Sequence, residues 1–522
     1  MTSVPRTFTN PILPGFYPDP SICRVGEDFY LATSTFSYFP GIPLFHSRDL
    51  VHWEQLGHAL TRTSQLDLSG CEHSHGIFAP TLRYHGGTFY LITTNVGGIG
   101  NFYVTATDVA GPWSDPVVLP TEGIDPTIFF DGDGTAYYLG TRGKRNASYW
   151  GDNEVYLQRL DVKRGEVVGP CHALWDGAAK NAFWAEGPHL YKKDDYYYLL
   201  IAEGGTGHEH AVTVARSRDL YGPYEACPNN PILTHRHLGR RHPIVNVGHG
   251  DFVDTPTGEW WIVALGSHPY GGYYRNMGRE TFLAPVIWED GWPVVCPGAG
   301  QVRAVEAAPN LAPAFMPKPP ARDCFPGGEI GSQWITLRAP AARFATPRAG
   351  AADGIRLRLL PETLAKRASP AFLAMRQTHM NYALTARFSF SPACDGEGAG
   401  LALVQSDQYH LCLLRTREDG MHCVALTRVE KGIATRLAIA PYTGEFTCLR
   451  IRADGQRLSF FYGPEETSLS LLLDGVSAAF LSPDVAGGFV GTCMGLYAVG
   501  KQGYMDVEFA EISSEDAPGI EF

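Results

Sequence analysis

The sequence predicts an all-β protein in which a five-bladed β-propeller is followed by a jelly-roll-like β-sandwich. Two observations carry this prediction: a motif that recurs five times in the N-terminal part, and short alternating runs in the C-terminal part. A chain of 522 residues is too long for one core and ample for two. We expect the propeller over residues 1–300, a Pro/Ala-rich linker over 301–322 and the sandwich over 323–522.

Each copy of the motif opens on one distinctive residue and closes on an aromatic pair. The opening residue precedes the second aromatic by 11, 11, 13, 12 and 12 positions. Repeats of this length, built from β-branched and aromatic runs between Gly, Asp and Pro, are typical of four-stranded propeller blades. The opening residues are Asp19, Ala79, Asp125, Glu186 and His249, and the pairs are Phe29-Tyr30, Phe89-Tyr90, Tyr137-Tyr138, Tyr197-Tyr198 and Trp260-Trp261.

Three of the five opening residues are acids: Asp19, Asp125 and Glu186. The innermost strand of each blade begins beside the central axis, so equivalent positions gather around one cavity. An Asp before Pro is by itself more typical of a turn, but its repetition at the same place in different blades favours a site. Carboxyl groups crowded in an aromatic pocket repel one another and cost stability, which indicates an enzyme.

Carboxyls with different protonation states are what glycoside hydrolysis requires. One acid must carry a proton for the leaving oxygen, while another stays ionised to activate water. The longer side chain of Glu186 suits the general acid, and Asp19 then serves as the general base. Asp125 is predicted to orient Glu186 and to raise its pKa by like-charge repulsion.

The segments around these residues resemble glycoside hydrolase family 43, in its β-xylosidase and α-L-arabinofuranosidase branch. The resemblance implies an inverting, exo-acting enzyme that releases terminal β-D-xylose or α-L-arabinofuranose from xylan- or arabinoxylan-derived oligosaccharides. It also implies the roles given above for the three acids, and no cofactor for the chemistry. The matching segments are residues 10–21, 76–80, 123–126, 185–192 and 278–285.

The same resemblance implies further substrate-binding residues. Arg279 matches an arginine that clamps sugar hydroxyls, a task suited to a planar fork of donors. His249 matches a residue that lies under the sugar or contacts a structural Ca²⁺ through water, and no other metal ligand is predicted. The remaining candidates are the pocket walls Phe36 and Phe78, the nearby His75, and Phe489, which reaches in from the sandwich.

The composition changes after the propeller. Residues 296–322 are rich in Pro and Ala, which indicates a linker running along the surface. Runs with a period of two follow, as in residues 355–360, 383–390 and 446–452, and indicate antiparallel strands. These segments resemble the sandwich that is appended to family xylosidases, in which one loop narrows the pocket and favours exo-cleavage.

Composition and charge limit the partners. The chain has 42 Lys and Arg against 54 Asp and Glu, a formal net charge of −12, without a basic patch. This argues against nucleic acid and against anionic polymers, and a small neutral oligosaccharide fits better. No apolar run is long enough to span a bilayer. Relatives with such a sandwich often form dimers or tetramers, so a homo-oligomer is compatible with the resemblance.

The N-terminus and the cysteines indicate the compartment. The first residues lack a hydrophobic secretion segment, and the eleven cysteines include no C-x-x-C pair. We therefore expect reduced thiols and a cytoplasmic location.

Two alternatives remain open from sequence. A retaining β-fructosidase-type enzyme also joins a propeller to a sandwich, but it would show Arg-Asp-Pro and Glu-Cys where this chain has Ile124-Asp125-Pro126 and Glu186-Gly187. A non-catalytic glycan-binding propeller is the second alternative, and three intact acids count against it. The sequence does not decide between xyloside and arabinofuranoside, because loop contacts of a few kcal/mol set that choice.

Overall fold

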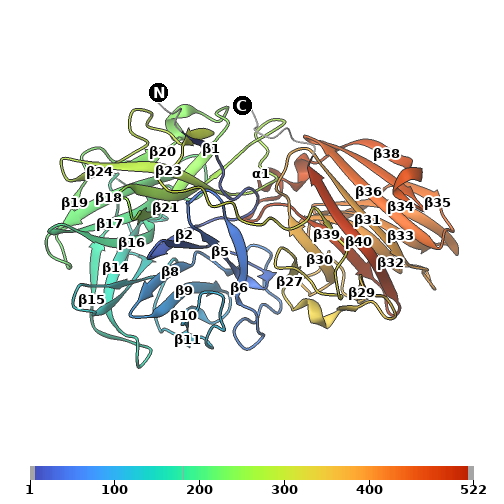
Figure 1. Ribbon diagram of the computed structural model, residues 1–522, viewed down its shortest axis with the longest axis horizontal. Helices are drawn as coiled ribbons and strands as arrows, with labels where there is room; N and C mark the ends of the chain where they lie inside the picture. The colour runs from blue at the N-terminus through green and yellow to red at the C-terminus, as the bar shows by residue number, and fades with distance from the viewer. Residues whose placement is uncertain (1–5, 180, 515–522) are drawn as a thin grey trace.

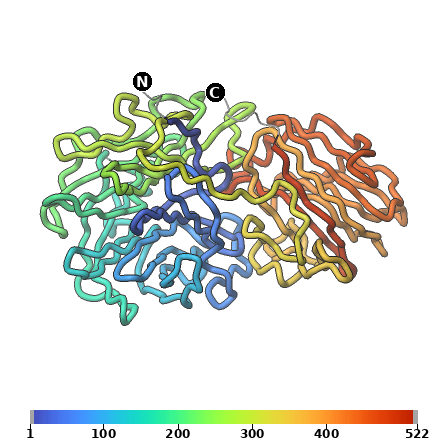
Figure 2. The backbone as a smooth tube through the Cα atoms, in the orientation of Figure 1, coloured from blue at the N-terminus to red at the C-terminus, as the bar shows by residue number. Residues whose placement is uncertain are grey.

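The computed structural model describes residues 6–179 and 181–514, and strands make up almost all of its regular structure. Figures 1 and 2 show two lobes, one running from blue to green and one from orange to red. The first lobe consists of five antiparallel sheets and the second of two large sheets, so the predicted fold class is confirmed. Among the described residues, no helix has the length and apolar character needed to cross a membrane.

Each blade is an antiparallel sheet whose strands follow one another in chain order. Blade 1 contains β2 (Ser21–Val25), β3 (Asp28–Ala32), β5 (Gly41–Ser47) and β6 (Glu54–Leu60). Blade 2 contains β7 (Gly76–Ile77), β8 (Thr81–His85), β9 (Thr88–Val96), β10 (Gly100–Ala106) and β11 (Val117–Val118). Blade 3 contains β12 (Thr127–Phe130), β13 (Ala136–Gly143), β14 (Asn153–Asp161) and β15 (Glu166–Trp175).

The last two blades follow the same plan. Blade 4 contains β16 (Glu186–Lys193), β17 (Tyr196–Glu203), β18 (Ala211–Ser217), β19 (Glu225–Ala226) and β20 (Leu233–Thr234). Blade 5 contains β21 (Val245–Asp254), β22 (Trp260–Ser267), β23 (Glu280–Glu289) and β24 (Trp292–Val295). The recurring motif thus spans the innermost strand of every blade and the strand paired with it, which carries the aromatic pair. Its opening residue lies at the start of the innermost strand or two residues before it, except His249, which lies within β21.

The two ends of the propeller segment meet. Strand β1 (Thr7–Thr9) pairs with β25 (Val305–Ala307), and the Asn10 side chain donates hydrogen bonds to the carbonyls of Leu283 and Arg303. The segment predicted as a linker therefore includes a short strand, because the N-terminal strand supplies it with a partner. This pairing ties the start of the chain to blade 5 and to the exit from the propeller.

The sandwich has two antiparallel layers around one apolar core. One layer contains β26 (Arg322–Asp323), β28 (Ala345–Pro347), β29 (Ile355–Arg358), β31 (Tyr382–Ser389), β36 (Phe446–Asp454), β37 (Arg457–Gly463), β38 (Ser470–Ser477) and β40 (Tyr504–Ser514). The other contains β4 (Tyr38–Phe39), β27 (Ile335–Leu337), β30 (Ala371–Arg376), β32 (Gly398–Ser406), β33 (Tyr409–Glu418), β34 (Met421–Glu430), β35 (Ile433–Pro441) and β39 (Cys493–Val499).

One strand of the second layer, β4, comes from the propeller part of the chain. It pairs with β27, with Tyr38 opposite Leu337 and Phe39 opposite Thr336. Phe36, two residues before β4, is buried in an apolar cluster that includes side chains from both lobes. The two lobes therefore share a sheet and a core, which fixes the sandwich against one side of the propeller.

A second buried feature joins four blades of the propeller. The Asp251 carboxylate on β21 accepts hydrogen bonds from Arg83 (2.8 Å), from the Ser21 hydroxyl (2.8 Å) and from the Tyr191 hydroxyl (2.5 Å). Although burial favours its neutral form, Arg83 and His189 lower the pKa of Asp251 to about 2. We call Ser21, Arg83, His189, Tyr191 and Asp251 the axial network.

Candidate active site

All five blades and the sandwich contribute to one cavity. It encloses about 440 Å³ of space, counting its open mouth, which lies at the small end of the range for ligand sites. Eight of the nine candidate residues from sequence line it. The lining residues are Asp19, Phe36, Phe78, Ala79, Ile124, Asp125, Glu186, Thr206, His210, His249, Arg279 and Phe489.

The opening residues of the five motifs all reach this cavity. Asp19, Asp125 and His249 have φ angles of 55°, 52° and 45°, in the left-handed region that costs a non-glycine residue about 1–3 kcal/mol. Such strain recurs at three equivalent positions, where the backbone turns into the innermost strand. The turn aims each side chain at the propeller axis.

Asp19 is held in its ionised form. Its carboxylate accepts hydrogen bonds from Arg279 Nη1 (2.6 Å) and from Ser34 Oγ (2.5 Å). Burial raises the pKa of Asp19, but the charges of Arg279 and His249 together with the Ser34 hydrogen bond bring it below its ordinary value. An ionised carboxylate that still has free lone pairs can accept a proton from water.

The surroundings of Glu186 favour its protonated form. It is half-buried at the start of β16, and burial raises its pKa well above the ordinary value. The neighbouring carboxyls of Asp125 and Asp19 raise it further, and Arg279 opposes them without reversing the direction. A carboxyl group with a raised pKa keeps its proton to higher pH and can donate it.

Asp125 lies between these two extremes. Burial raises its pKa to about 6, the charge of Asp19 adds to this, and His249 and the Gly187 backbone N–H oppose it. Near neutral pH it is therefore largely ionised, and its negative charge favours the proton on Glu186.

The imidazole of His249 packs closely on the chain beside the acid. A Cβ at Gly187 would lie 2.9 Å from His249 Cε1, and Gly187 has a φ of 57°. Only glycine fits both the backbone angle and the space. The residue that follows Glu186 in the motif thus allows the acid and His249 to come together.

Arg279 combines a charge contact with an apolar setting. Its guanidinium donates to Asp19, to Thr206 Oγ1 (3.2 Å) and to the Phe489 carbonyl (3.4 Å), and its carbon lies 5.6 Å from the Phe36 ring centre. Its Nε has no hydrogen-bond partner among the described residues. The side chain is only 9% exposed, so burial and these contacts hold it in one orientation.

Three phenylalanine rings form one wall. The Phe36 and Phe78 ring centres are 5.1 Å apart, and Phe489 lies 5.9 Å from Phe36 and 6.0 Å from Phe78. Phe489 enters from the sandwich, where its N–H donates to Ser74 Oγ (2.9 Å), and its side chain is 39% exposed. The cavity wall is thus built by both lobes.

The sandwich loop that carries Phe489 packs closely against the backbone of the propeller. A Cβ at Gly278, which has a φ of 78°, would lie 2.9 Å from the Gly491 Cα. Gly278 directly precedes Arg279, and Gly491 follows Phe489 by two positions. The two glycines let the arginine and the phenylalanine approach the same cavity from different lobes.

His75 is the one candidate that does not line the cavity. Its side chain is 44% exposed and lies 3.9 Å from Glu72. The structure thus places it on the surface near the Ser74 contact rather than with the other candidates.

Sequence reasoning missed two polar residues of blade 4. Thr206 and His210 line the cavity from the connection between β17 and β18. His210 is 1% exposed, its Nδ1 lies 3.0 Å from the Asn246 carbonyl oxygen, and its Nε2 has no partner within the described part of the chain. Burial lowers the pKa of His210 to about 3, so its ring is neutral. Neither residue lies in the recurring motif.

An aromatic cluster beside the acid was also missed. Trp150 is 77% exposed and lies 4.6 Å from the Trp184 ring, and Trp184 in turn lies 5.6 Å from Phe183, which is 44% exposed. Trp184 precedes Glu186 by two positions. The dipeptides Tyr149-Trp150 and Phe183-Trp184 were the available signal, because exposed paired aromatics are unusual.

Metal ligands are sparse in the structure. In residues 6–179 and 181–514, no group of three or more His, Cys, Asp or Glu has the arrangement to hold a metal ion. The cavity brings together three carboxyls whose pKa values are shifted differently: that of Asp19 is lowered, and those of Asp125 and Glu186 are raised.

The chain matches two family models that together span most of its length. "Glycosyl hydrolases family 43" matches residues 8–293, and "Beta xylosidase C-terminal Concanavalin A-like domain" matches residues 322–513. A xylosidase/arabinosidase of Butyrivibrio fibrisolvens is 45% identical over 94% of this chain and 95% of its own length. A non-reducing end α-L-arabinofuranosidase of Bacteroides ovatus is 41% identical over 95% of this chain and 92% of its own.

A solved structure agrees with these matches. The xylan β-1,4-xylosidase of Bacillus halodurans superposes with a TM-score of 0.91 at 35% identity, covering 97% of this chain and all of that one. The acids, the propeller that positions them and the matched sequence all lead to one conclusion. The chain belongs to glycosyl hydrolase family 43, and it is a glycoside hydrolase.

Proposed function

We propose that this enzyme removes single terminal sugars from short neutral oligosaccharides with inversion at the anomeric carbon. The observation that carries the proposal is the division of protonation states in one small cavity. Arg279 and Ser34 keep Asp19 ionised, whereas burial and two neighbouring acids keep Glu186 protonated.

The reaction follows from these states. Asp19 takes a proton from a water molecule, whose oxygen attacks the anomeric carbon from the face opposite the leaving group. As the glycosidic bond breaks, Glu186 gives its proton to the leaving oxygen. One bond to water forms and one to the leaving group breaks, so the configuration inverts. Proton exchange with solvent then restores both acids.

The other lining residues divide into two groups in this proposal. Arg279, His249 and His210 face the hydroxyls of the terminal sugar, with Phe36, Phe78 and Phe489 against its apolar face. Outside the lining, Trp150 and Phe183 are exposed and pack on Trp184, two positions before Glu186, and we assign this aromatic cluster to the leaving-group side. A cavity closed by a residue from the second lobe holds a chain end and excludes a chain interior.

We propose β-D-xylose and α-L-arabinofuranose as the sugars released, from xylan- or arabinoxylan-derived oligosaccharides. The support is that relatives 45% and 41% identical are a xylosidase/arabinosidase and an α-L-arabinofuranosidase. A side-by-side assay of nitrophenyl β-D-xyloside and nitrophenyl α-L-arabinofuranoside, compared by kcat/KM, decides the preference.

Proton NMR of the first product tests the mechanism. We expect the anomer of opposite configuration to appear first and to mutarotate afterwards. First appearance of the retained anomer would contradict the base role of Asp19 and favour the retaining, β-fructosidase-type alternative. Absence of hydrolysis on all nitrophenyl glycosides would favour a non-catalytic glycan-binding propeller.

The working compartment and a metal are further parts of this proposal. All eleven cysteines are free thiols, which supports the reducing cytoplasm, where the substrate would arrive as short oligosaccharides. A Ca²⁺ contacted by His249 through water stays a prediction. Activity and Tm after EDTA treatment, with Ca²⁺ re-addition as the control, test it.

A further inference from the structure

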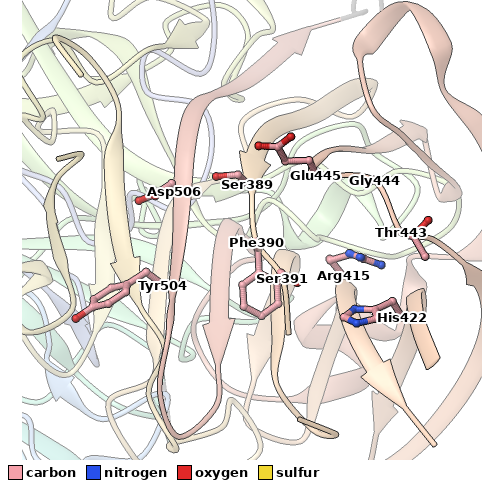
Figure 3. Close-up of a pocket in the computed structure, with 10 residues that line it drawn as sticks. All are labelled: Ser389, Phe390, Ser391, Arg415, His422, Thr443, Gly444, Glu445, Tyr504 and Asp506. Atoms are coloured by element: carbon pink, nitrogen blue, oxygen red, sulfur yellow. The ribbon is translucent and has the colours of Figure 1, made fainter. Parts of the chain in front are cut away.

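A second cavity opens within the sandwich. It encloses about 960 Å³, counting its mouth, and shares no lining residue with the catalytic cavity. Figure 3 shows it between the end of β31, the strands β33 and β34, and the loop that carries Thr443, Gly444 and Glu445. Nothing in the catalytic mechanism uses this space.

An inward-facing arginine lines this cavity. Arg415 on β33 continues the row of Leu411 and Leu413, which belong to the sandwich core, and it pairs with Val424 of β34. Its side chain is 2% exposed, and its Nε and Nη1 have no hydrogen-bond partner among the described residues. A buried cation with unsatisfied donors destabilises a fold, so a ligand that accepts these hydrogen bonds explains its presence better than packing does.

A histidine adds a second unsatisfied group on the same face. His422 lies two positions before Val424 on β34, so its side chain is a diagonal neighbour of Arg415. Its Nδ1 is buried without a partner in the described part of the chain. The Arg415 guanidinium also lies 5.0 Å from the Tyr442 ring, which holds its plane in place.

The opposite side of the cavity supplies acceptors, hydroxyls and an aromatic ring. Glu445 and Thr443 are exposed on the loop, and the Tyr504 ring is 52% exposed, with Arg356 covering it at 5.0 Å. Asp506 is already paired with Arg356 (2.6 Å).

The cavity lining contains one cation, Arg415, and two carboxylates, Glu445 and Asp506. Asp506 is paired with Arg356, which lies outside the lining, so Arg415 faces one uncompensated carboxylate. The site therefore offers both donors and acceptors, and its charges compensate once Arg356 is counted. This combination suits a polyhydroxylated neutral ligand better than an anion, because vicinal hydroxyls accept from a guanidinium and donate to a carboxylate.

We propose that this cavity is a non-catalytic binding site for a neutral glycan, with Arg415 and Glu445 bonding the hydroxyls of one sugar residue and Tyr504 contacting its apolar face. The site would hold an oligosaccharide on the sandwich while the catalytic cavity processes free ends. The choice of arabinoxylan as the first polysaccharide to test rests on the proposed function. The proposal that the cavity binds a neutral glycan does not.

Affinity electrophoresis of the full-length protein tests the proposal. Four native gels are compared: one without polysaccharide, one with soluble arabinoxylan, one with β-glucan and one with anionic polygalacturonate. A polysaccharide offers many internal sugars but few chain ends, so binding in the catalytic cavity contributes little to the retardation. We expect at least one neutral polysaccharide to retard the wild type. R415L and Y504A should each reduce that retardation at least threefold, with kcat/KM on a nitrophenyl glycoside within twofold of wild type.

The controls separate binding from folding and from catalysis. I433A removes an exposed apolar side chain that does not line the cavity, and should keep full retardation. R415L should keep or raise the Tm, because it removes unsatisfied buried donors. No retardation of the wild type by either neutral polysaccharide, retardation by polygalacturonate alone, or undiminished retardation of R415L and Y504A would overturn the proposal. Failure of the proposed function would appear instead in the nitrophenyl assay of the wild type.

Discussion

Two of the buried groups of charged residues in the propeller are organised in opposite ways. In the axial network, the Asp251 carboxylate is surrounded by the donors of Arg83, Ser21 and Tyr191, and its pKa falls to about 2. In the catalytic cavity, three carboxyls share essentially one arginine, which pairs with Asp19 and leaves Glu186 with a raised pKa.

The difference separates structure from function. A buried acid with full compensation holds blades together, and its protonation state does not change near neutral pH. A buried acid that its neighbours repel keeps a proton it can give away. Hence charge compensation, rather than burial alone, distinguishes the two groups, and the following variants test that distinction.

Replacing the acid should produce the largest effect. We expect E186A to lower kcat on xylobiose or another unactivated disaccharide by about 10²–10⁴-fold, because no other group protonates the leaving oxygen. Its Tm should not fall, because the substitution removes a carboxyl group that the neighbouring carboxyls of Asp125 and Asp19 repel. The measurement is sugar release combined with thermal unfolding. E166A, an exposed acid on β15, serves as the matched control. Full activity of E186A would refute the assignment.

Replacing the compensated acid should affect stability instead. D251N leaves Arg83 buried without its counter-charge, so we expect a loss of about 3–5 kcal/mol in the free energy of unfolding. D254N on the same strand weakens the half-exposed pair with Arg24 and should cost about 0–1 kcal/mol. Denaturant unfolding measures both, and equal losses would contradict the comparison.

The axial network also has a pH signature. Because the folded-state pKa of Asp251 is depressed, its contribution to stability is present above the ordinary carboxyl range and disappears as the pH falls toward about 2. The stability difference between wild type and D251N should therefore shrink in acid. Denaturant unfolding of both proteins between pH 7 and 3 checks this.

Replacing Asp125, which is predicted to raise the pKa of Glu186, should have a smaller effect on activity. D125N removes a negative charge that raises the pKa of Glu186, so the alkaline limb of kcat/KM should move to lower pH. Full pH–rate profiles on a disaccharide show the shift. D161N, at the end of β14, is the control and should leave the limb in place. An unmoved limb in D125N would show that Asp125 does not act through Glu186.

The smallest effect is expected from a change in the phenylalanine wall of the catalytic cavity. F489A should raise KM about 2- to 12-fold, the effect of about 0.5–1.5 kcal/mol of lost ring contact. F315A removes an exposed ring of the connecting segment and should leave KM unchanged. Steady-state kinetics on a nitrophenyl xyloside compares the two, and equal KM values would remove Phe489 from the sugar site.

Much of the fold and part of the site could be predicted from the repeats. Five equivalent positions imply one axis, so Asp19, Asp125, Glu186 and His249 could be placed together without a structure. The resemblance added Arg279 and the aromatic walls. The placement of His75 could not be checked in this way, because closeness in sequence to Phe78 does not fix the direction of a loop side chain.

What escaped prediction depends on contacts between distant segments. Thr206 and His210 lie in the connection between β17 and β18, and the equivalent connections of the other blades differ in length and sequence, so no pattern marks them. The axial network depends on Arg83 meeting Asp251 across 168 positions. Likewise, the two residues of β4 look like a blade connection until β27 provides their partner. Local alternation of side chains carries no information about such pairings.

Because β4 belongs to the sandwich sheet, the two lobes of this enzyme evolve and can be engineered only together. A truncation after residue 300 would strip the backbone of Tyr38 and Phe39 of its partner and expose the apolar surface around Phe36. The sandwich therefore cannot be exchanged freely for another domain, either in evolution or by design. A transplanted replacement would need a matching edge as well as a ring in the place of Phe489.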